Sequence, residues 1–201
     1  RVKKQLKKFM NNFLFKDKID VVLIDWHGIL SKRGFWCNQS KINQNLGDWC
    51  KLVFEGELFK DWMRDKISFS QLCEMTAGKF RLSEDAITDY FEKDLGEYGP
   101  KWEVCNMIDN LFPESKKVLF SENPLLFKEK ILNDNRLASY FDDIVLSCDH
   151  GVLKEDRNPS LFDIALRQLN LDNFNNVVLI DDKVDNCAYF RELGGHIINI
   201  K

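Results

Sequence analysis

The chain has 201 residues, 44% of them hydrophobic and 30% charged, which suffices for one domain with a hydrophobic core and a modest insertion. No apolar run approaches the ~20 residues that span a membrane, which argues against a transmembrane helix, and a net charge of −3 argues against nucleic acid as the main partner. The six cysteines form no CxxC pair, so we expect reduced thiols in a cytoplasmic protein rather than a disulfide framework or a zinc site.

The first 18 residues are strongly basic, whereas the rest of the chain is acidic. They hold seven Lys or Arg residues and one acidic residue, a net charge of +6, whereas the rest of the chain holds 22 basic and 31 acidic residues. Apolar residues at helical spacing, with lysines on the other side, predict a basic amphipathic lead-in helix over 1–18. We expect this helix to pack on the domain or on an upstream one; the alternative is contact with a membrane surface or an acidic partner. Because the chain begins with Arg1 rather than Met, we expect it to be part of a longer protein.

Five short runs rich in Val, Ile, Leu and Phe are predicted strands, and helical patterns separate them. Runs that are apolar at every position are typical of strands buried on both faces, as in parallel sheets. Strands that alternate with helices predict an α/β fold, a Rossmann-like parallel five-stranded sheet with helices on both faces. The predicted strands are 19–25, 117–121, 143–147, 177–181 and 196–200.

The span 31–115, between the first two predicted strands, is too long for a loop. It has its own helical patterns and is predicted to be an inserted all-α cap, which leaves 19–30 and 116–201 for the core. Aromatic residues recur in this span at helical spacing, which favours the packed interior of a small helical module over a ligand site.

Local signals mark where several helices begin. Ser68-Phe69-Ser70-Gln71 has the pattern of a capping box, with Gly78 as the stop. Ser83 precedes a further helix whose first turn is acidic. In the predicted core, Asn123-Pro124 is expected to begin one helix, with Asn as the N-cap, and Pro159 is expected to open another.

Two of the predicted strands end on carboxylates in nearly the same way. Val21-Val22-Leu23-Ile24 is followed by Asp25, and Val177-Val178-Leu179-Ile180 by Asp181 and Asp182. In open α/β sheets ligands bind at the carboxyl ends of the strands. Clustered carboxylates repel one another unless a cation lies between them, so the pattern indicates a Mg2+ site. The alternative is that each aspartate caps the helix that follows it.

Other predicted strand ends supply different polar groups. Ser121 and Ser147 end two strands, and Lys154 follows the third strand along the chain. A carboxylate nucleophile, a hydroxyl and an ammonium that hold oxyanions, and further carboxylates for a cation are the groups that phosphoryl transfer requires.

Four motifs in the correct order resemble those of the haloacid-dehalogenase-like (HAD) hydrolase superfamily. The resemblance covers about residues 19–200, and the insertion falls where members with a small helical cap have theirs. The motifs are Asp25-Trp26-His27-Gly28-Ile29-Leu30, Leu119-Phe120-Ser121-Glu122-Asn123, Gly151-Val152-Leu153-Lys154 and Ile180-Asp181-Asp182-Lys183-Val184-Asp185-Asn186.

The resemblance implies a role for each matching residue. Asp25 would attack phosphorus and form an aspartyl-phosphate, and Asp182 would be the principal Mg2+ ligand with Asp181 in support. Asp25 and the main-chain carbonyl of His27 would complete the metal site. The transferring phosphoryl group would be held by Ser121, Lys154 and Asn123, with the backbone turning sharply beneath it at Gly28.

Two departures from the family pattern bear on catalysis. His27 stands where the family has its second aspartate, the usual acid/base; because imidazole titrates near neutrality, His27 is a candidate for that role. The segment after Lys154 is about two residues longer than usual, which leaves Arg157 as an alternative phosphate-binding cation.

We therefore expect an enzyme, a Mg2+-dependent phosphatase for a small phosphorylated metabolite with the cap as its specificity element. The alternative is a catalytically impaired HAD-like domain that binds a ligand or partner within a larger protein. Carbon–halogen hydrolysis is a third hypothesis. The pair Asp181 and Asp182 argues against it, because that reaction needs no cation.

Overall fold

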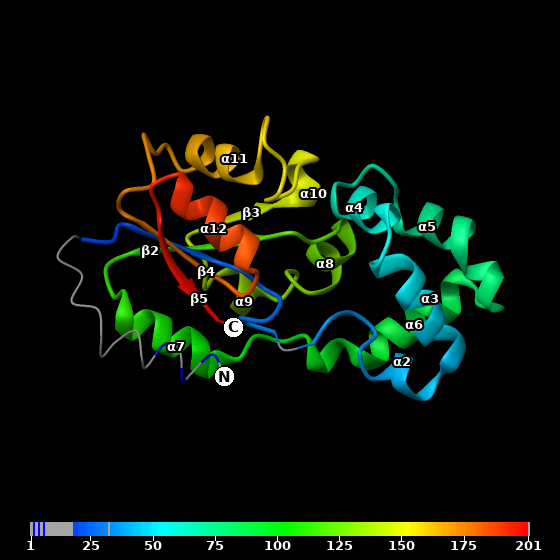
Figure 1. Cartoon of the computed structure of the whole chain (residues 1–201). Helices are drawn as coiled ribbons and strands as arrows, with labels where there is room; N and C mark the ends of the chain where they lie inside the picture. Colours follow the sequence, from blue (N-terminus) through cyan, green and yellow to red (C-terminus); the bar gives the residue numbers. More distant parts are fainter. Residues whose placement is uncertain (1, 3, 5, 7–17, 32, 201) are drawn as a thin grey trace.

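The computed structural model describes residues 2, 4, 6, 18–31 and 33–200. Its core is a five-stranded sheet in which all four neighbouring strand pairs are parallel, in the order β3-β2-β1-β4-β5 (Figure 1). The predicted α/β fold is confirmed, and each predicted strand is present within two residues at either end. The strands are β1 (Val21–Ile24), β2 (Lys116–Ser121), β3 (Asp143–Leu146), β4 (Val177–Asp181) and β5 (His196–Asn199).

The register of the three central strands decides which side chains meet at their carboxyl ends. Ile24, the last residue of β1, pairs with Leu119 of β2 and with Ile180 of β4. The residues that follow these three positions therefore emerge at one edge of the sheet. All four residues of β1 are buried, as expected for a central strand covered on both faces.

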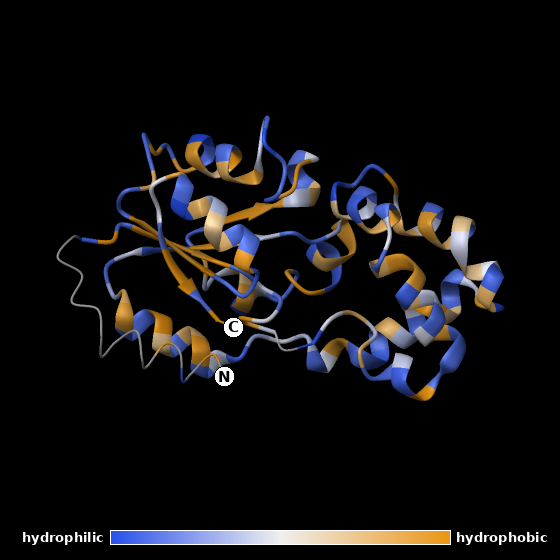
Figure 2. Cartoon of the chain, in the orientation of Figure 1, coloured by the Kyte–Doolittle hydropathy of each residue, from blue (hydrophilic) through white to orange (hydrophobic). Residues whose placement is uncertain are grey.

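Helices cover both faces of the sheet, and the alternating strand residues divide the apolar interior into two clusters. One face packs against α11 (Leu161–Gln168) and α12 (Val184–Glu192). The other packs against α7 (Trp102–Leu111) and α8 (Leu125–Lys130). Figure 2 shows the result, with hydrophobic strands between helices that have both hydrophobic and hydrophilic residues. Two short helices complete this layer structure, α9 (Asn135–Ala138) and α10 (Ser147–His150).

The insertion between β1 and β2 forms a second, helical lobe beside the sheet (Figure 1). Its interior is aromatic, and Trp49 and Trp62 are almost fully buried, as the sequence indicated. Phe54 and Phe59, expected in the same interior, are only half-buried and line a cavity. The lobe comprises α2 (Gln39–Ile42), α3 (Gln44–Phe54), α4 (Glu57–Met63), α5 (Phe69–Thr76), η1 (Ala77–Phe80), α6 (Glu84–Asp94) and η2 (Leu95–Glu97).

The last helix of the predicted cap span packs with the core instead. Helix α7 lies beneath the sheet in Figure 1. The hydroxyl of Tyr140 donates a hydrogen bond to the carbonyl of Cys105 at 3.2 Å, and the Trp102 ring packs edge-on against the Tyr140 ring. The span 31–115 thus contains helices of both lobes, and α7 connects the cap back to β2.

The helix signals in the cap are mostly confirmed. Ser68 and Gln71 form the capping box of α5, and the Ser83 side chain accepts a hydrogen bond from the amide of Ala86 at the start of α6. Gly78 is not the stop, because the chain continues through it as η1 and turns at Arg81, whose φ is +55°.

The start of α8 differs from the prediction. Pro124 occupies the N-cap position, and Asn123 makes no capping bond there. Asn123 is instead fully buried and bonded to Ser121 and Ser147. At α11 the N-cap is Ser160, directly after the proline expected to open that helix.

The predicted lead-in helix over 1–18 lies largely outside the described residues. Val2, Lys4 and Leu6 are helical, and Val2 and Leu6 are buried in the same apolar cluster as one face of the sheet. Contact of this segment with a membrane surface or an acidic partner stays a prediction. Among the described residues, none of the helices has the length and apolar character to cross a membrane.

Candidate active site

Three strand ends deliver buried polar side chains to one point. Asp25 follows β1, Ser121 ends β2 and Asp181 ends β4, and at most 6% of each residue is exposed. Asp25 does not cap a helix, because no helix directly follows it, whereas Asp181 accepts a hydrogen bond from the amide of Lys183, the N-cap residue of α12. Each strand stays buried up to its polar end because the residues just before that end are apolar on both faces of the sheet.

Lys154 lies between two of these carboxylates. Its ammonium is 2.9 Å from Oδ1 of Asp25 and 2.9 Å from Oδ2 of Asp181, and its side chain is 1% exposed. The backbone amide of Lys154 donates to Glu122 at 2.8 Å, which fixes the loop that positions the side chain. Arg157, the alternative cation, is exposed and stacks on the Tyr189 ring at 3.4 Å from its centroid.

Burial and charge set the protonation of the two carboxylates in opposite directions. Burial raises the pKa of Asp25 to about 6, against the lowering effect of Lys154. For Asp181 burial is outweighed by Lys154 and by hydrogen bonds from the amide of Lys183 and the side chain of Asn186, so its pKa is lowered. Burial disfavours the charge of Lys154, yet the two carboxylates raise its pKa. Asp181 and Lys154 therefore form the charged pair on which the site is built.

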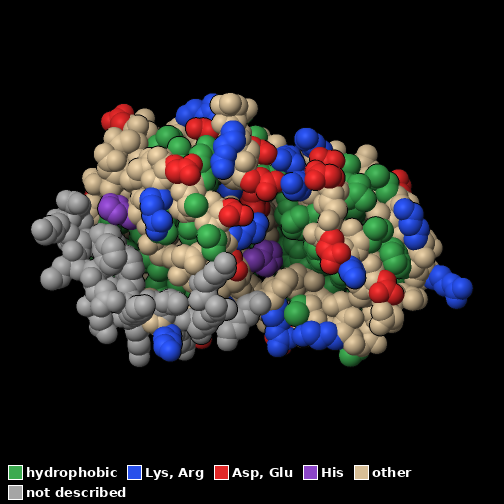
Figure 3. Space-filling model, viewed as in Figure 1, with side chains coloured by type: hydrophobic (Ala, Val, Ile, Leu, Met, Phe, Trp, Pro, Cys, Tyr) green, Lys and Arg blue, Asp and Glu red, His purple; other side chains and the backbone are tan. Residues whose placement is uncertain are grey.

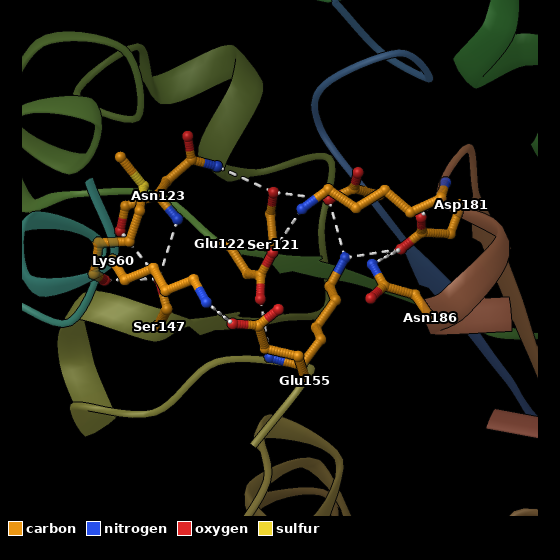
Figure 4. A network of polar contacts seen from close by, with 12 residues as sticks. Lys60, Ser121, Glu122, Asn123, Ser147, Glu155, Asp181 and Asn186 are labelled. Atoms are coloured by element: carbon orange, nitrogen blue, oxygen red, sulfur yellow. Dashed lines mark hydrogen bonds and ion pairs between the residues drawn. The ribbon is translucent and has the colours of Figure 1, made fainter. Parts of the chain in front are cut away.

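A chain of hydrogen bonds connects Asp25 to the cap. The hydroxyl of Ser121 donates to Oδ1 of Asp25 at 2.8 Å and accepts from the side-chain amide of Asn123 at 2.9 Å. The backbone amide of Asn123 donates to the hydroxyl of Ser147 at 3.0 Å, which in turn donates to the carbonyl of Met63 at 2.7 Å. Met63 is the last residue of α4, so this buried network runs from the nucleophile candidate to the cap. Figure 4 shows its middle members, Ser121, Asn123 and Ser147.

Three carboxylates offer a cation site. Oxygen atoms of Asp25, Asp181 and Asp182 all lie within 4.8 Å of one another. Gly28 leaves room for this group: its φ is +76°, and a Cβ at that position would lie 2.3 Å from Oδ2 of Asp182. Burial, and then the charge of Asp181, raise the pKa of Asp182. Hard oxygen ligands at this spacing fit a divalent cation such as Mg2+.

His27 lies in the cavity wall but differs from the sequence-based expectation. Burial, and then the charges of Lys183 and Lys154, lower its pKa to about 4 rather than leaving it near neutrality. Its Nε2 atom is buried and has no hydrogen-bond partner among the described residues. The imidazole is therefore neutral at pH 7 in the metal-free protein.

A cavity of about 430 Å³ opens between the core and the helical lobe. Figure 3 shows charged side chains and a histidine gathered where the two lobes meet, beside hydrophobic side chains of the cap. The core lines the cavity with Asp25, His27, Gly28, Glu122, Asp182 and Lys183. The cap and the segment leading into it supply Arg33, Gly34, Phe35, Phe54, Phe59 and Met63.

Sequence reasoning did not reveal how two of these lining residues interact. Glu122 and Lys183 stand in the family-like motifs, and Glu122 was expected to border the phosphate pocket, but their ion pair, with the Lys183 ammonium 2.9 Å from the Glu122 carboxylate, was not predicted. The one sequence feature that pointed to this pair is that Glu122 and Lys183 each lie just after a strand end. Ser147 was singled out as a strand end, and its role as a buried link between Asn123 and Met63 emerges only in three dimensions.

No protein-family model matches the chain, and no curated protein matches it significantly. Solved structures do match. A predicted HAD-like family hydrolase of Porphyromonas gingivalis has a TM-score of 0.70 at 19% identity, over 91% of this chain and 91% of that one. A HAD-family enzyme of Bacteroides thetaiotaomicron, in complex with magnesium and inorganic phosphate, has a TM-score of 0.69 at 19% identity, over 91% of this chain and 94% of that one.

An L-2-haloacid dehalogenase of Xanthobacter autotrophicus, with chloropropionic acid covalently bound, matches with a TM-score of 0.62 at 15% identity, over 89% of this chain and 76% of that one. At such identities the likeness concerns the fold, and the small-cap subfamily and the role of His27 stay predictions. These matches over most of both chains show that the five-stranded parallel sheet with its helical insertion has the fold of the HAD-like hydrolases.

Proposed function

We propose that the chain is a Mg2+-dependent phosphatase that hydrolyses a small phosphomonoester through an aspartyl-phosphate. The observation that supports this most is the position of Asp25, on the floor of the cavity and within 4.8 Å of two further carboxylates. The similar fold of the Bacteroides enzyme, whose structure contains magnesium and inorganic phosphate, adds support from outside the chain.

Asp25 would act as the nucleophile. Ser121 and Lys154 both bind its Oδ1 atom, so Oδ2 is the oxygen left to face phosphorus. In the first step a bond forms between this oxygen and phosphorus, and the bond between phosphorus and the alcohol oxygen breaks, so that the alcohol leaves as an alkoxide that takes its proton from water. In the second step water attacks phosphorus, and the carboxylate and inorganic phosphate are released. Lys154 and Ser121, already beside Asp25, would hold the phosphoryl oxygens during both steps.

His27 would act at most as a weak general base in the second step. Burial lowers its pKa to about 4, so the imidazole is neutral at pH 7 and less basic than a solvent-exposed histidine, which limits the help it would give to the attacking water. Its buried Nε2 atom has no hydrogen-bond partner among the described residues.

Asp182 and Asp25 are the residues best placed to hold Mg2+. The Asp181 carboxylate already accepts hydrogen bonds from Lys154, the Lys183 amide and Asn186, which suits a supporting position. Bound there, Mg2+ would neutralise charge on the phosphoryl group. Contribution of the His27 carbonyl to this site stays part of the proposal.

A second candidate is a HAD-like domain that binds a ligand or partner without turnover. The observation in its favour is His27 itself, because a neutral imidazole replaces the carboxyl group that would protonate the leaving group. The same cavity and carboxylates would then serve binding alone.

Release of phosphate from p-nitrophenyl phosphate and a panel of metabolites, in Mg2+ and in EDTA, tests the proposal. Asp25→Asn should abolish turnover, whereas Asp20→Asn, at an exposed position before β1, should leave it unchanged. Turnover that requires Mg2+ and Asp25 supports the phosphatase. Absence of turnover on every ester, in folded protein that binds Mg2+, favours the binding domain, and metal-independent release of halide from a 2-haloacid would favour carbon–halogen hydrolysis.

A further inference from the structure

The cavity above Asp25 has two walls of different chemistry. The core wall is charged, with Asp25, Glu122, Asp182 and Lys183. The cap wall is largely apolar: beside Arg33 and Gly34 it consists of Phe35, Phe54, Phe59 and Met63. A phosphate bound at Asp25 would therefore direct the organic part of its ester away from the charges and towards the cap.

Two aromatic rings form the accessible part of the cap wall. Phe54, at the end of α3, and Phe59, in α4, are only half-buried, although their rings pack edge-to-face with centroids 5.4 Å apart. Other aromatic side chains of the cap, such as Trp36 and Trp49, are by contrast fully buried. Half-exposed rings that face a cavity are a surface on which another apolar or aromatic group gains free energy by burial.

Polar partners for a substrate are scarce on this side. Of the described residues that line the cavity, those from the cap and its entry segment include one polar side chain, Arg33. Its guanidinium is already hydrogen-bonded to Asn38 and lies 3.6 Å from the Glu97 carboxylate. A substrate with several hydroxyl groups would lose hydrogen bonds to water here without replacing them, which is costly.

We infer that the phosphomonoester accepted by this site has a compact, aryl-containing alcohol as its organic part, which lies against Phe54, Phe59 and Met63. The inference rests on the proposed function for the phosphate end of the substrate. The cavity volume of about 430 Å³ falls within the range of small-molecule sites and accommodates a phosphate with one aromatic ring.

A pair of esters with similar leaving groups tests the inference. Benzyl phosphate and glycerol 3-phosphate both release primary alcohols, so a difference between them reports contacts with the organic part. We expect kcat/KM in Mg2+ to be at least about tenfold higher for benzyl phosphate, the order of effect that burial of one ring provides. A preference for glycerol 3-phosphate, or equal values, overturns the inference and leaves the phosphatase proposal intact.

Two variants of one position separate polarity from size. Phe59→Gln should reduce the preference for benzyl phosphate at least about fivefold, whereas Phe59→Leu, of similar size but apolar, should keep it within about twofold. Equal effects of both variants would show that the apolar wall does not select the substrate. Thermal unfolding of both variants checks that the cap remains folded.

A binding measurement with phosphonates that cannot be hydrolysed tests the aryl site separately from the phosphatase proposal. Titration calorimetry of the wild type with Mg2+ would compare 2-phenylethylphosphonate and 3,4-dihydroxybutylphosphonate, in which a methylene group replaces the bridging oxygen of each ester. Tighter binding of the phenyl compound supports the aryl site even if no ester is hydrolysed, in which case only the phosphatase proposal fails. A reversed or absent preference contradicts the aryl site.

Discussion

Replacing Lys154 with Met removes the ammonium that lies 2.9 Å from both Asp25 and Asp181 and keeps a side chain of similar length. Two buried carboxylates then remain without the cation between them. Removal of one partner from a buried ion pair costs roughly 3–5 kcal/mol. In a chain of this size each 1 kcal/mol shifts Tm by about 2–4 °C, so we expect Tm to fall by roughly 6–20 °C.

This loss should increase with pH. Burial already raises the pKa of Asp25 to about 6 although Lys154 lowers it, and without Lys154 the carboxyl keeps its proton to still higher pH. A carboxyl whose pKa is higher in the folded state binds more protons there, so the free energy of unfolding falls as pH rises from the unfolded pKa through the folded one. The difference between Lys154→Met and the wild type should therefore be larger at pH 8 than at pH 5.

Thermal and urea unfolding followed by circular dichroism in EDTA measures both effects. Lys66→Met is the matched control, because the ion pair of Lys66 with Asp61, at 3.6 Å, lies on the exposed surface. This variant should change the free energy of unfolding by about 0.5 kcal/mol or less. A Lys154→Met variant within about 1 kcal/mol of the wild type at pH 8, or a loss equal at both pH values, would refute the assignment of a buried charged cluster.

Three further changes probe the metal site, the cap and the thiols. Gly28→Ala should weaken Mg2+ binding at least about tenfold in calorimetry, because the added Cβ would lie 2.3 Å from a carboxylate oxygen of the site; Gly78→Ala, in open space, should not. Arg64→Met should lower the free energy of unfolding by about 1–2 kcal/mol, measured by thermal unfolding, because it removes the ion pair with Asp156 in the loop that carries Lys154. Iodoacetamide at pH 8 should label half-buried Cys37 well before Cys50, whose pKa burial raises to about 12, as read by peptide mass spectrometry.

Each of these expectations has a result that would count against it. Unchanged Mg2+ affinity in Gly28→Ala would separate that glycine from the cation site. For the cap, Lys130→Met is the comparison, since Lys130 pairs with Glu92 at an exposed position, and an equal effect of both variants would argue against a special role of Arg64. Labelling of Cys50 as fast as Cys37 would mean that the cap interior opens readily.

The fold and the strand-end residues could be predicted because they depend on local pattern. The apolar runs before Asp25 and Asp181 define strands, and alternation with helices fixes a parallel sheet whose carboxyl ends meet. Asn123 was expected at the site, yet its predicted capping role was wrong because Pro124 takes that position. The side chain of Asn123 can either cap the helix or hydrogen-bond to Ser121 inside the core, and sequence spacing does not reveal which of the two it does.

Long-range features could not be predicted in this way. Whether Lys154 or Arg157 reaches Asp25 depends on the path of a loop, and the pairing of Arg157 with Tyr189 joins segments 32 positions apart. The lowered pKa of His27 depends on burial and on lysines brought close by the fold. The apolar cap wall likewise depends on how α3 and α4 are oriented towards the core, which helical periodicity alone leaves open.

A covalent bond between Asp25 and phosphorus distinguishes a phosphatase from a binding domain most directly. Protein mixed with excess p-nitrophenyl phosphate and Mg2+, quenched in acid during turnover and reduced with borohydride, should contain homoserine at position 25 in peptide mass spectrometry. The same treatment without substrate, or of Asp25→Asn, should leave that position unreduced. Mg2+-dependent phosphate release with no reduction at position 25, or with reduction at another carboxylate, would contradict the account.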